Sequence, residues 1–179
     1  MTPRIPVLLL LLCSLASAKE IELDGRTAKP LPLTLVAQIR SDICSACDLP
    51  GDDVKFSKLF RTGTFVAGRH HRVLIVQASP YCLCSATGNC EFWVFERTQK
   101  GYRQLLHKED VQTFKFLPIS SNGFRDLQTS MHASAFYSDL TVYRFDGQQY
   151  TLDRCFSRSY HDENGRDLKK PAIAENFCP

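Results

Sequence analysis

The sequence predicts a β-rich α+β fold: an antiparallel meander sheet of about seven to nine strands, with one N-terminal helix packed on it. Two observations lead to this prediction. Short apolar runs are separated by turn residues over most of the chain, whereas a segment near the start has helical spacing. A β-sandwich or a barrel is the alternative arrangement of the same strands.

The centre of the expected sheet lies in two apolar runs, residues 73–76 and 92–95. Each run is too short for a typical helix and is rich in β-branched or aromatic residues, which is typical of strands. The apolar character is almost continuous instead of alternating. We therefore expect both faces of these two strands to be covered.

The expected helix covers residues 34–48. Apolar residues at positions 35, 36, 39 and 43 follow the spacing of one helical face. Pro50 and Gly51 then end the helix. This helix is the expected cover for one face of the sheet.

The other expected strands follow from short β-type patterns bounded by turn residues. Asp146-Gly147 separates two of them and predicts a two-residue hairpin. The charged segment 161–170 is expected to be a loop or tail. In chain order, the full set of expected strands is 54–60, 63–67, 73–78, 91–97, 102–107, 111–117, 126–132, 139–145 and 148–156.

Residues 1–18 have the pattern of a secretory signal peptide. Arg4 supplies the positive charge, an apolar run follows, and Ala16-Ser17-Ala18 is a small-residue cleavage site. The apolar run is too short to serve as a membrane anchor. We expect the mature chain, residues 19–179, to be a single disulfide-stabilised domain.

The charge of the chain gives no reason to expect a nucleic-acid or membrane partner. The formal net charge is +3, and it falls by one when the leader with Arg4 is removed. No later segment is apolar enough to cross a bilayer. The sequence thus predicts a secreted or periplasmic protein with no nucleic-acid partner and no membrane insertion. Its expected partner is another exported or cell-envelope protein.

The cysteines are expected to form a disulfide framework, because an oxidising compartment favours pairing. One of the eight cysteines, Cys13, lies in the leader, so an odd number remains. One of these is then free, modified or paired with another chain. The favoured pairs are Cys44–Cys47, Cys155–Cys178, and Cys90 with either Cys82 or Cys84.

Two enzymatic alternatives also rest on cysteines. Cys44 and Cys47 form a C-x-x-C, but at the end of the expected helix the dipole would raise the thiol pKa. The second alternative is a zinc site made by Cys82, Cys84 and Cys90 with His70 or His71. Their spacing is not a usual zinc pattern, and no G-x-S-x-G or H-E-x-x-H motif is present. The sequence therefore favours a protein without catalytic residues, cofactor or metal.

A polar stretch after the expected strand 111–117 is the candidate partner-binding loop. Its candidate contact residues are Asn122, Phe124, Arg125 and Asp126. Exposed aromatic residues and arginine are favoured at interfaces. In the alternative interpretation, Asp126 accepts backbone hydrogen bonds and orders the turn.

Four short motifs lie between residues 63 and 156: Cys84-x5-Cys90-x-Phe92-Trp93-Val94-Phe95, Gly101-Tyr102, Asn122-Gly123-Phe124-Arg125-Asp126-Leu127 and Tyr143-Arg144-Phe145-Asp146-Gly147-x-x-Tyr150. They resemble those of small exported, mostly uncharacterised bacterial β-rich proteins. The chain is also distantly similar to periplasmic lysozyme inhibitors and to FG-GAP-type β segments.

The missing catalytic motifs and the disulfide-stapled β framework, whose turns can present loops, favour an exported, non-enzymatic binding or inhibitor-like module of unknown partner. A thiol- or zinc-dependent enzyme and a structural envelope protein are the alternatives.

Overall fold

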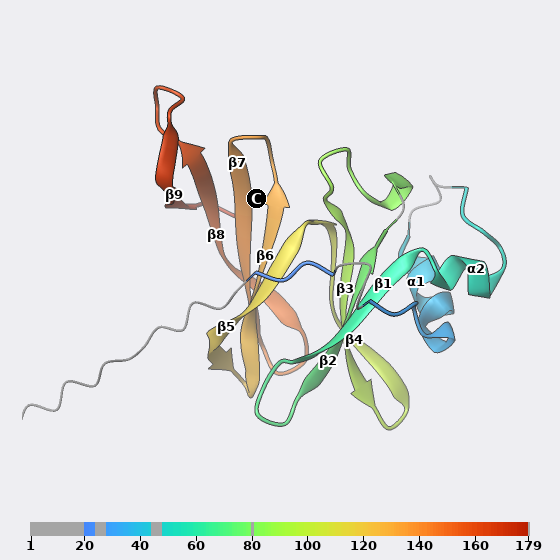
Figure 1. Cartoon of the computed structure of the whole chain (residues 1–179). Coiled ribbons are helices and arrows are strands. Elements are labelled where there is room, and N and C mark those ends of the chain that lie inside the picture. The colour runs from blue at the N-terminus through green and yellow to red at the C-terminus, as the bar shows by residue number, and fades with distance from the viewer. Residues whose placement is uncertain (1–19, 24–27, 44–47, 80, 179) are drawn as a thin grey trace, which may run out of the picture.

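The protein is built from two antiparallel sheets and a few short helices (Figure 1). The computed structural model describes residues 20–23, 28–43, 48–79 and 81–178. The chain is mostly β, as expected, but the strands form two sheets instead of one. The prediction of a single sheet is therefore wrong.

Both sheets are simple meanders in which each strand pairs with its neighbours in the chain. The first sheet contains β1 (Phe60–Val66), β2 (Arg72–Ala78), β3 (Cys90–Thr98) and β4 (Gly101–Val111). The second contains β5 (Thr113–Ser121), β6 (Phe124–His132), β7 (Tyr137–Phe145), β8 (Tyr150–His161) and β9 (Asp167–Asn176). The helical segments are η1 (Leu33–Leu35), α1 (Val36–Asp42), α2 (Asp53–Ser57) and η2 (Tyr81–Leu83).

Three local predictions need correction. The expected helix 34–48 is shorter, since α1 ends at Asp42. Residues 53–57 form α2 instead of a strand, because the Asp52 side chain accepts a hydrogen bond from the Lys55 amide and caps a helical turn. At the other end, the expected charged tail contributes β9, which pairs with β8.

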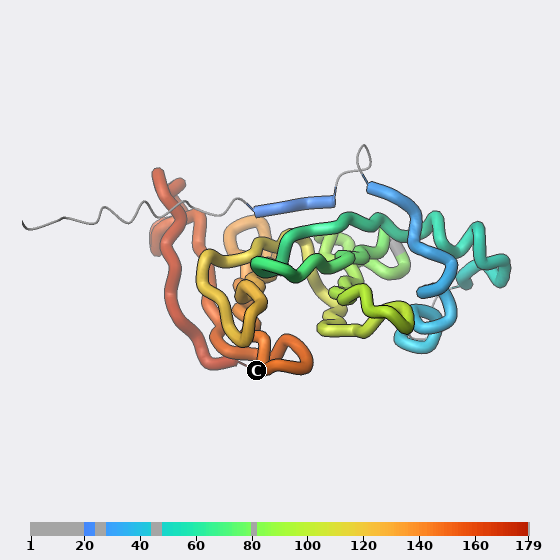
Figure 2. Tube along the Cα trace, turned by 90° about the horizontal axis from the view of Figure 1, so that it is seen from below, coloured from blue at the N-terminus to red at the C-terminus, as the bar shows by residue number. Residues whose placement is uncertain are grey.

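The molecule has three layers, which Figure 2 shows side by side: the five-stranded sheet, the four-stranded sheet and the helices. One apolar cluster, which includes Ile75, Val94 and Phe114, fills the space between the sheets. A second, which includes Ile39 and Trp93, fills the space between the four-stranded sheet and the helices. The prediction that both faces of the central strands are covered is confirmed.

The N-terminal segment connects the two sheets along one side. Ile21 exchanges two backbone hydrogen bonds with Phe114 of β5, at 2.7 and 3.1 Å. Lys29 exchanges two with Thr62 of β1, at 3.1 and 2.8 Å. The segment therefore covers one outer edge of each sheet, as the blue trace in Figures 1 and 2 shows.

Two hairpin turns differ from the expectation. A two-residue turn lies at Asn122-Gly123, both with positive φ (49° and 88°), where Ser121 pairs with Phe124. The connection after β7 has four residues, because Phe145 pairs with Tyr150. The Asp146 carboxylate accepts hydrogen bonds from the amides of Gln148 and Gln149 (2.7 and 2.8 Å), and these bonds lower its pKa. Of these two pairs, the asparagine-glycine pair therefore makes a two-residue turn and the aspartate-glycine pair does not.

Candidate functional site

The candidate partner-binding loop is mainly committed to contacts within the protein. Phe124 is 2% exposed, and its ring lies 4.1 Å from the rings of both His71 and Phe145. The Arg125 guanidinium donates to the backbone oxygens of Phe116 and Leu117, at 2.8 Å each. The aromatic ring and the guanidinium that suggested an interface therefore serve the packing of the hairpin.

The other two candidate residues differ in exposure. Asp126 is 1% exposed, and its Oδ1 atom has no hydrogen-bond partner among the described residues. Asn122 is exposed, and its amide donates to the backbone oxygen of Phe145 at 2.8 Å. A partner-binding role for these four residues stays a prediction, and Asn122 is the member with an exposed side chain.

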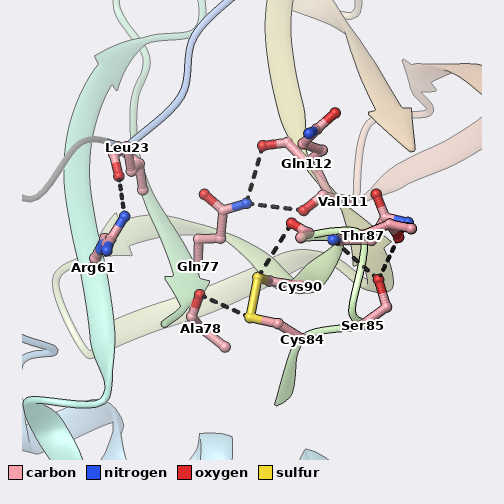
Figure 3. The surroundings of a disulfide bond; sticks show 12 residues. Leu23, Arg61, Gln77, Ala78, Cys84, Ser85, Thr87, Cys90, Val111 and Gln112 are labelled. Carbon is pink, nitrogen blue, oxygen red and sulfur yellow. Dashed lines mark hydrogen bonds between the residues drawn. A yellow bond between two sulfur atoms is a disulfide. The ribbon is translucent and has the colours of Figure 1, made fainter. Parts of the chain in front are cut away.

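The structure contains two of the favoured disulfides, Cys84–Cys90 (Figure 3) and Cys155–Cys178. In the first, the sulfur atoms of two of the three proposed zinc-binding cysteines are bonded to each other. They are therefore not thiolates that could bind zinc. Cys82 is exposed, and Cys44 and Cys47 lie outside the described residues.

Polar residues near the Cys84–Cys90 disulfide connect the two sheets. The Gln77 amide donates to the backbone oxygens of Val111 and Gln112, at 2.9 and 3.3 Å, where the chain leaves β4 (Figure 3). The buried Asn89 side chain exchanges hydrogen bonds of 2.9 and 2.7 Å with the backbone of His132. The Gln77 bonds hold the end of β4 to β2, and the Asn89 bonds hold the start of β3 to the end of β6.

Beside this junction lies a cavity of about 400 Å³ between β4 and the five-stranded sheet. Residues from β4, β6, β7 and β8, together with the C-terminal segment, form its walls. Its lining consists of Lys108, Asp110, Thr129, Met131, Asp139, Leu140, Thr141, Tyr143, Cys155, Phe156, Asn176 and Phe177.

Two smaller cavities continue along the same strand. One, of about 130 Å³, is lined by Lys108, Leu152 and residues shared with the large cavity. The other, of about 240 Å³, lies between the β4 segment from Gln104 to His107 and the residues Gln149 and Tyr150. We call the three cavities together, beside β4 from Gln104 to Asp110, the β4 trough.

The trough combines charges with apolar surface. Lys108, Asp110 and Asp139 line it, and none of them forms a side-chain ion pair within the described part of the chain. Leu152 is 48% exposed, and the Phe177 side chain is fully exposed. Such a mixture of apolar surface and a few polar groups is typical of a binding site.

Tyr143 supplies a neutral hydroxyl to the trough. Burial raises the pKa of its phenol above the ordinary value, and hydrogen bonds with Thr129 and Thr141 lower it by less. The phenol therefore keeps its proton at neutral pH. Along with the charged residues, it gives the trough donors and acceptors of different kinds.

Two histidine–glutamate pairs lie on or next to the four-stranded sheet, and His107 of one pair also lines the trough. His107 Nε2 lies 2.6 Å from Glu91, and the ring stacks on Trp93 with centroids 4.8 Å apart. His71 Nδ1 lies 3.3 Å from Glu96. Within the described residues, neither pair is joined by a serine or cysteine at hydrogen-bond distance, so neither forms a nucleophilic triad.

No protein-family model, curated protein or solved structure matches this chain. Among the described residues, no helix is long and apolar enough to cross a membrane. The two disulfides fit an extracellular or periplasmic location. The physical character of the trough is thus the basis for inferring function.

We expect loss of the Cys155–Cys178 disulfide to weaken both the fold and the trough. The bond closes a loop with a sequence separation of 23, and Cys155 lines the large cavity. The double variant Cys155→Ser/Cys178→Ser should lose about 3 kcal/mol of unfolding free energy, measured by urea denaturation. An unchanged urea midpoint would show that the bond contributes nothing to stability.

Proposed function

We propose that this protein is an exported, non-enzymatic binding module that recognises another exported or cell-envelope protein through the β4 trough. The observation that carries the proposal is the trough itself. It is open to solvent, and it joins charges without an ion-pair partner among the described residues to exposed apolar side chains. Exposed apolar surface of this kind is typical of an interaction site.

The leader-like first residues and the disulfides support the exported part of the proposal. The resemblance to exported bacterial β-rich proteins and inhibitors agrees with a binding role. The zinc-enzyme alternative is weakened, because Cys84 and Cys90 are joined to each other.

Site-specific photocrosslinking tests the proposal in the organism that makes the protein. A photoreactive phenylalanine analogue replaces Leu152 in the trough, and in a matched control it replaces Leu33, which is also exposed but lies in η1. We expect the Leu152 position to give one dominant adduct with another exported protein, identified by mass spectrometry. The Leu33 position should not give this adduct.

Equal adducts from both positions, or none from Leu152, would contradict the proposal. Adducts spread over many envelope proteins would instead favour a structural envelope role. In a further variant, the photoreactive residue is placed at a second trough position, Phe177. Adding the substitution Leu152→Glu to this variant should abolish the specific adduct, because it places a charge in the apolar part of the site.

A further inference from the structure

We propose that the β4 trough binds an extended segment of its partner by adding it as a strand to β4. This inference rests on the proposed function and names the form that the ligand takes. The segment would become the fifth strand of the four-stranded sheet. It would carry a lysine or arginine near one end of the pairing and an apolar side chain near the middle.

β4 lies at the edge of the four-stranded sheet. Within the described residues, β4 pairs with β3 along one edge, and the pairs and bridges include none along its other edge. Backbone N–H and C=O groups on such an edge are ready to pair with another chain. Residues of β4 line all three cavities, so open space lies beside this strand.

Each of the other outer edges carries a feature that hinders strand addition, which makes β4 distinctive. The N-terminal segment covers β1 at Lys29 and β5 at Ile21. The edge strand β9 contains Pro171, which has no N–H, directly after Lys169 and Lys170. Proline and lysine are common means of preventing strand pairing at an edge.

The two sheets differ in size. Four strands face five, and residues of β7 and β8, including Thr141, Tyr143 and Cys155, line the trough beyond β4. A strand added to β4 would lie about 4.8 Å beyond it and about 10 Å from the facing sheet. It would therefore cover these residues as a further strand of the sandwich would.

The charge and shape of the trough restrict the side chains of the added strand. Asp110 and Asp139 outnumber Lys108 in the large cavity, so a cationic side chain is favoured there. Leu152 and Tyr143 line the adjoining cavity, which suits an apolar side chain. Because alternate residues of a strand face the same side, these two side chains would be separated by an odd number of residues.

The register of β4 limits the length of the pairing. Irregularities interrupt its pairing with β3 on both sides of Leu106–Lys108, and these three residues pair regularly with Val94, Trp93 and Phe92. We expect the added strand to pair mainly with this short stretch. Side-chain contacts in the adjoining cavities would then supply the remaining affinity.

The test uses peptides selected from a random library displayed on phage against the mature protein. Amide hydrogen exchange with and without each selected peptide is followed by mass spectrometry. We expect exchange to slow about tenfold in the β4 segment around Leu106–Lys108 and to stay unchanged in β9. A version of the peptide N-methylated at alternate residues keeps its side chains but cannot pair with the edge, and it should bind at least about tenfold more weakly.

Variants of the protein separate side-chain selection from folding. Asp139→Asn should weaken a lysine-containing peptide about tenfold, whereas the exposed control Glu163→Gln should not. Strand addition would be overturned if the selected peptides left amide exchange in β4 unchanged. It would also be overturned if the peptides still bound when N-methylated at the odd positions and when N-methylated at the even positions. If the Leu152 adduct formed although strand addition was overturned, the proposed binding function would stand and only the strand-addition mode would be wrong. Failure to select any peptide would also count against strand addition.

Discussion

Replacing Trp93 by alanine is expected to destabilise the protein by about 3–5 kcal/mol, because it removes the largest side chain of the core. Trp93 is fully buried between the four-stranded sheet and the helices. Its ring stacks on His107 and meets the edge of Phe60, with centroids 5.8 Å apart. Its Nε1 atom donates to the Asp42 carboxylate at 3.1 Å, so the variant also leaves this carboxylate without a hydrogen bond from Trp93.

Urea denaturation followed by circular dichroism measures this effect. Fluorescence is unsuitable for the variant, since Trp93 is the only tryptophan. Trp93→Phe is the matched control, because it keeps an aromatic ring and should cost clearly less than alanine. Equal losses in the two variants would mean that the hydrogen bond to Asp42, and not the packing, dominates.

The central strands could be predicted from sequence because their almost continuous apolar composition indicates burial on both faces. Residues 73–76 and 92–95 are apolar on both faces, and both faces are covered. The division into two sheets could not be predicted in this way. A single residue, Gln112, separates β4 from β5, and only the pattern of pairing shows that the chain changes sheets there.

Other differences have local physical causes. Residues 54–60 carry apolar side chains that fit a strand, but the Asp52 cap begins a helix at Asp53. β9 is almost wholly exposed and rich in charge, so its composition resembles a loop. Its strand conformation depends on pairing with β8. The local sequence does not indicate this pairing.

The trough was not predicted because its residues are far apart in the sequence. Lys108 and Asp110 lie beyond the end of the strand expected at 102–107, and Asp139 begins another expected strand. Only the register of β6, β7 and β8 brings these positions to one place. By contrast, the contiguous polar residues of the loop 122–126 predict a binding site, although most of its side chains contact the protein itself.

Replacing Phe124 by alanine distinguishes these two roles for the loop. Phe124 is nearly fully buried and contacts His71, Phe145 and Tyr150, which belong to both sides of the sandwich. As a core residue, it should cost about 3–5 kcal/mol of unfolding free energy when truncated to alanine. If Phe124 were instead a partner-binding residue with an exposed ring, its replacement by alanine would change the free energy of unfolding little, and only partner binding would fall.

Phe124→Leu and Asn122→Asp complete this experiment. Leucine keeps most of the apolar volume, so Phe124→Leu should cost about 1–2 kcal/mol, less than alanine. The Asp side chain still allows positive φ at position 122 but cannot donate to the Phe145 backbone oxygen. If Asn122→Asp reduces formation of the Leu152 adduct while Phe124→Leu does not, the exposed end of the turn belongs to the interface. If neither variant changes the adduct, recognition is confined to the β4 trough, and Phe124 acts through packing alone.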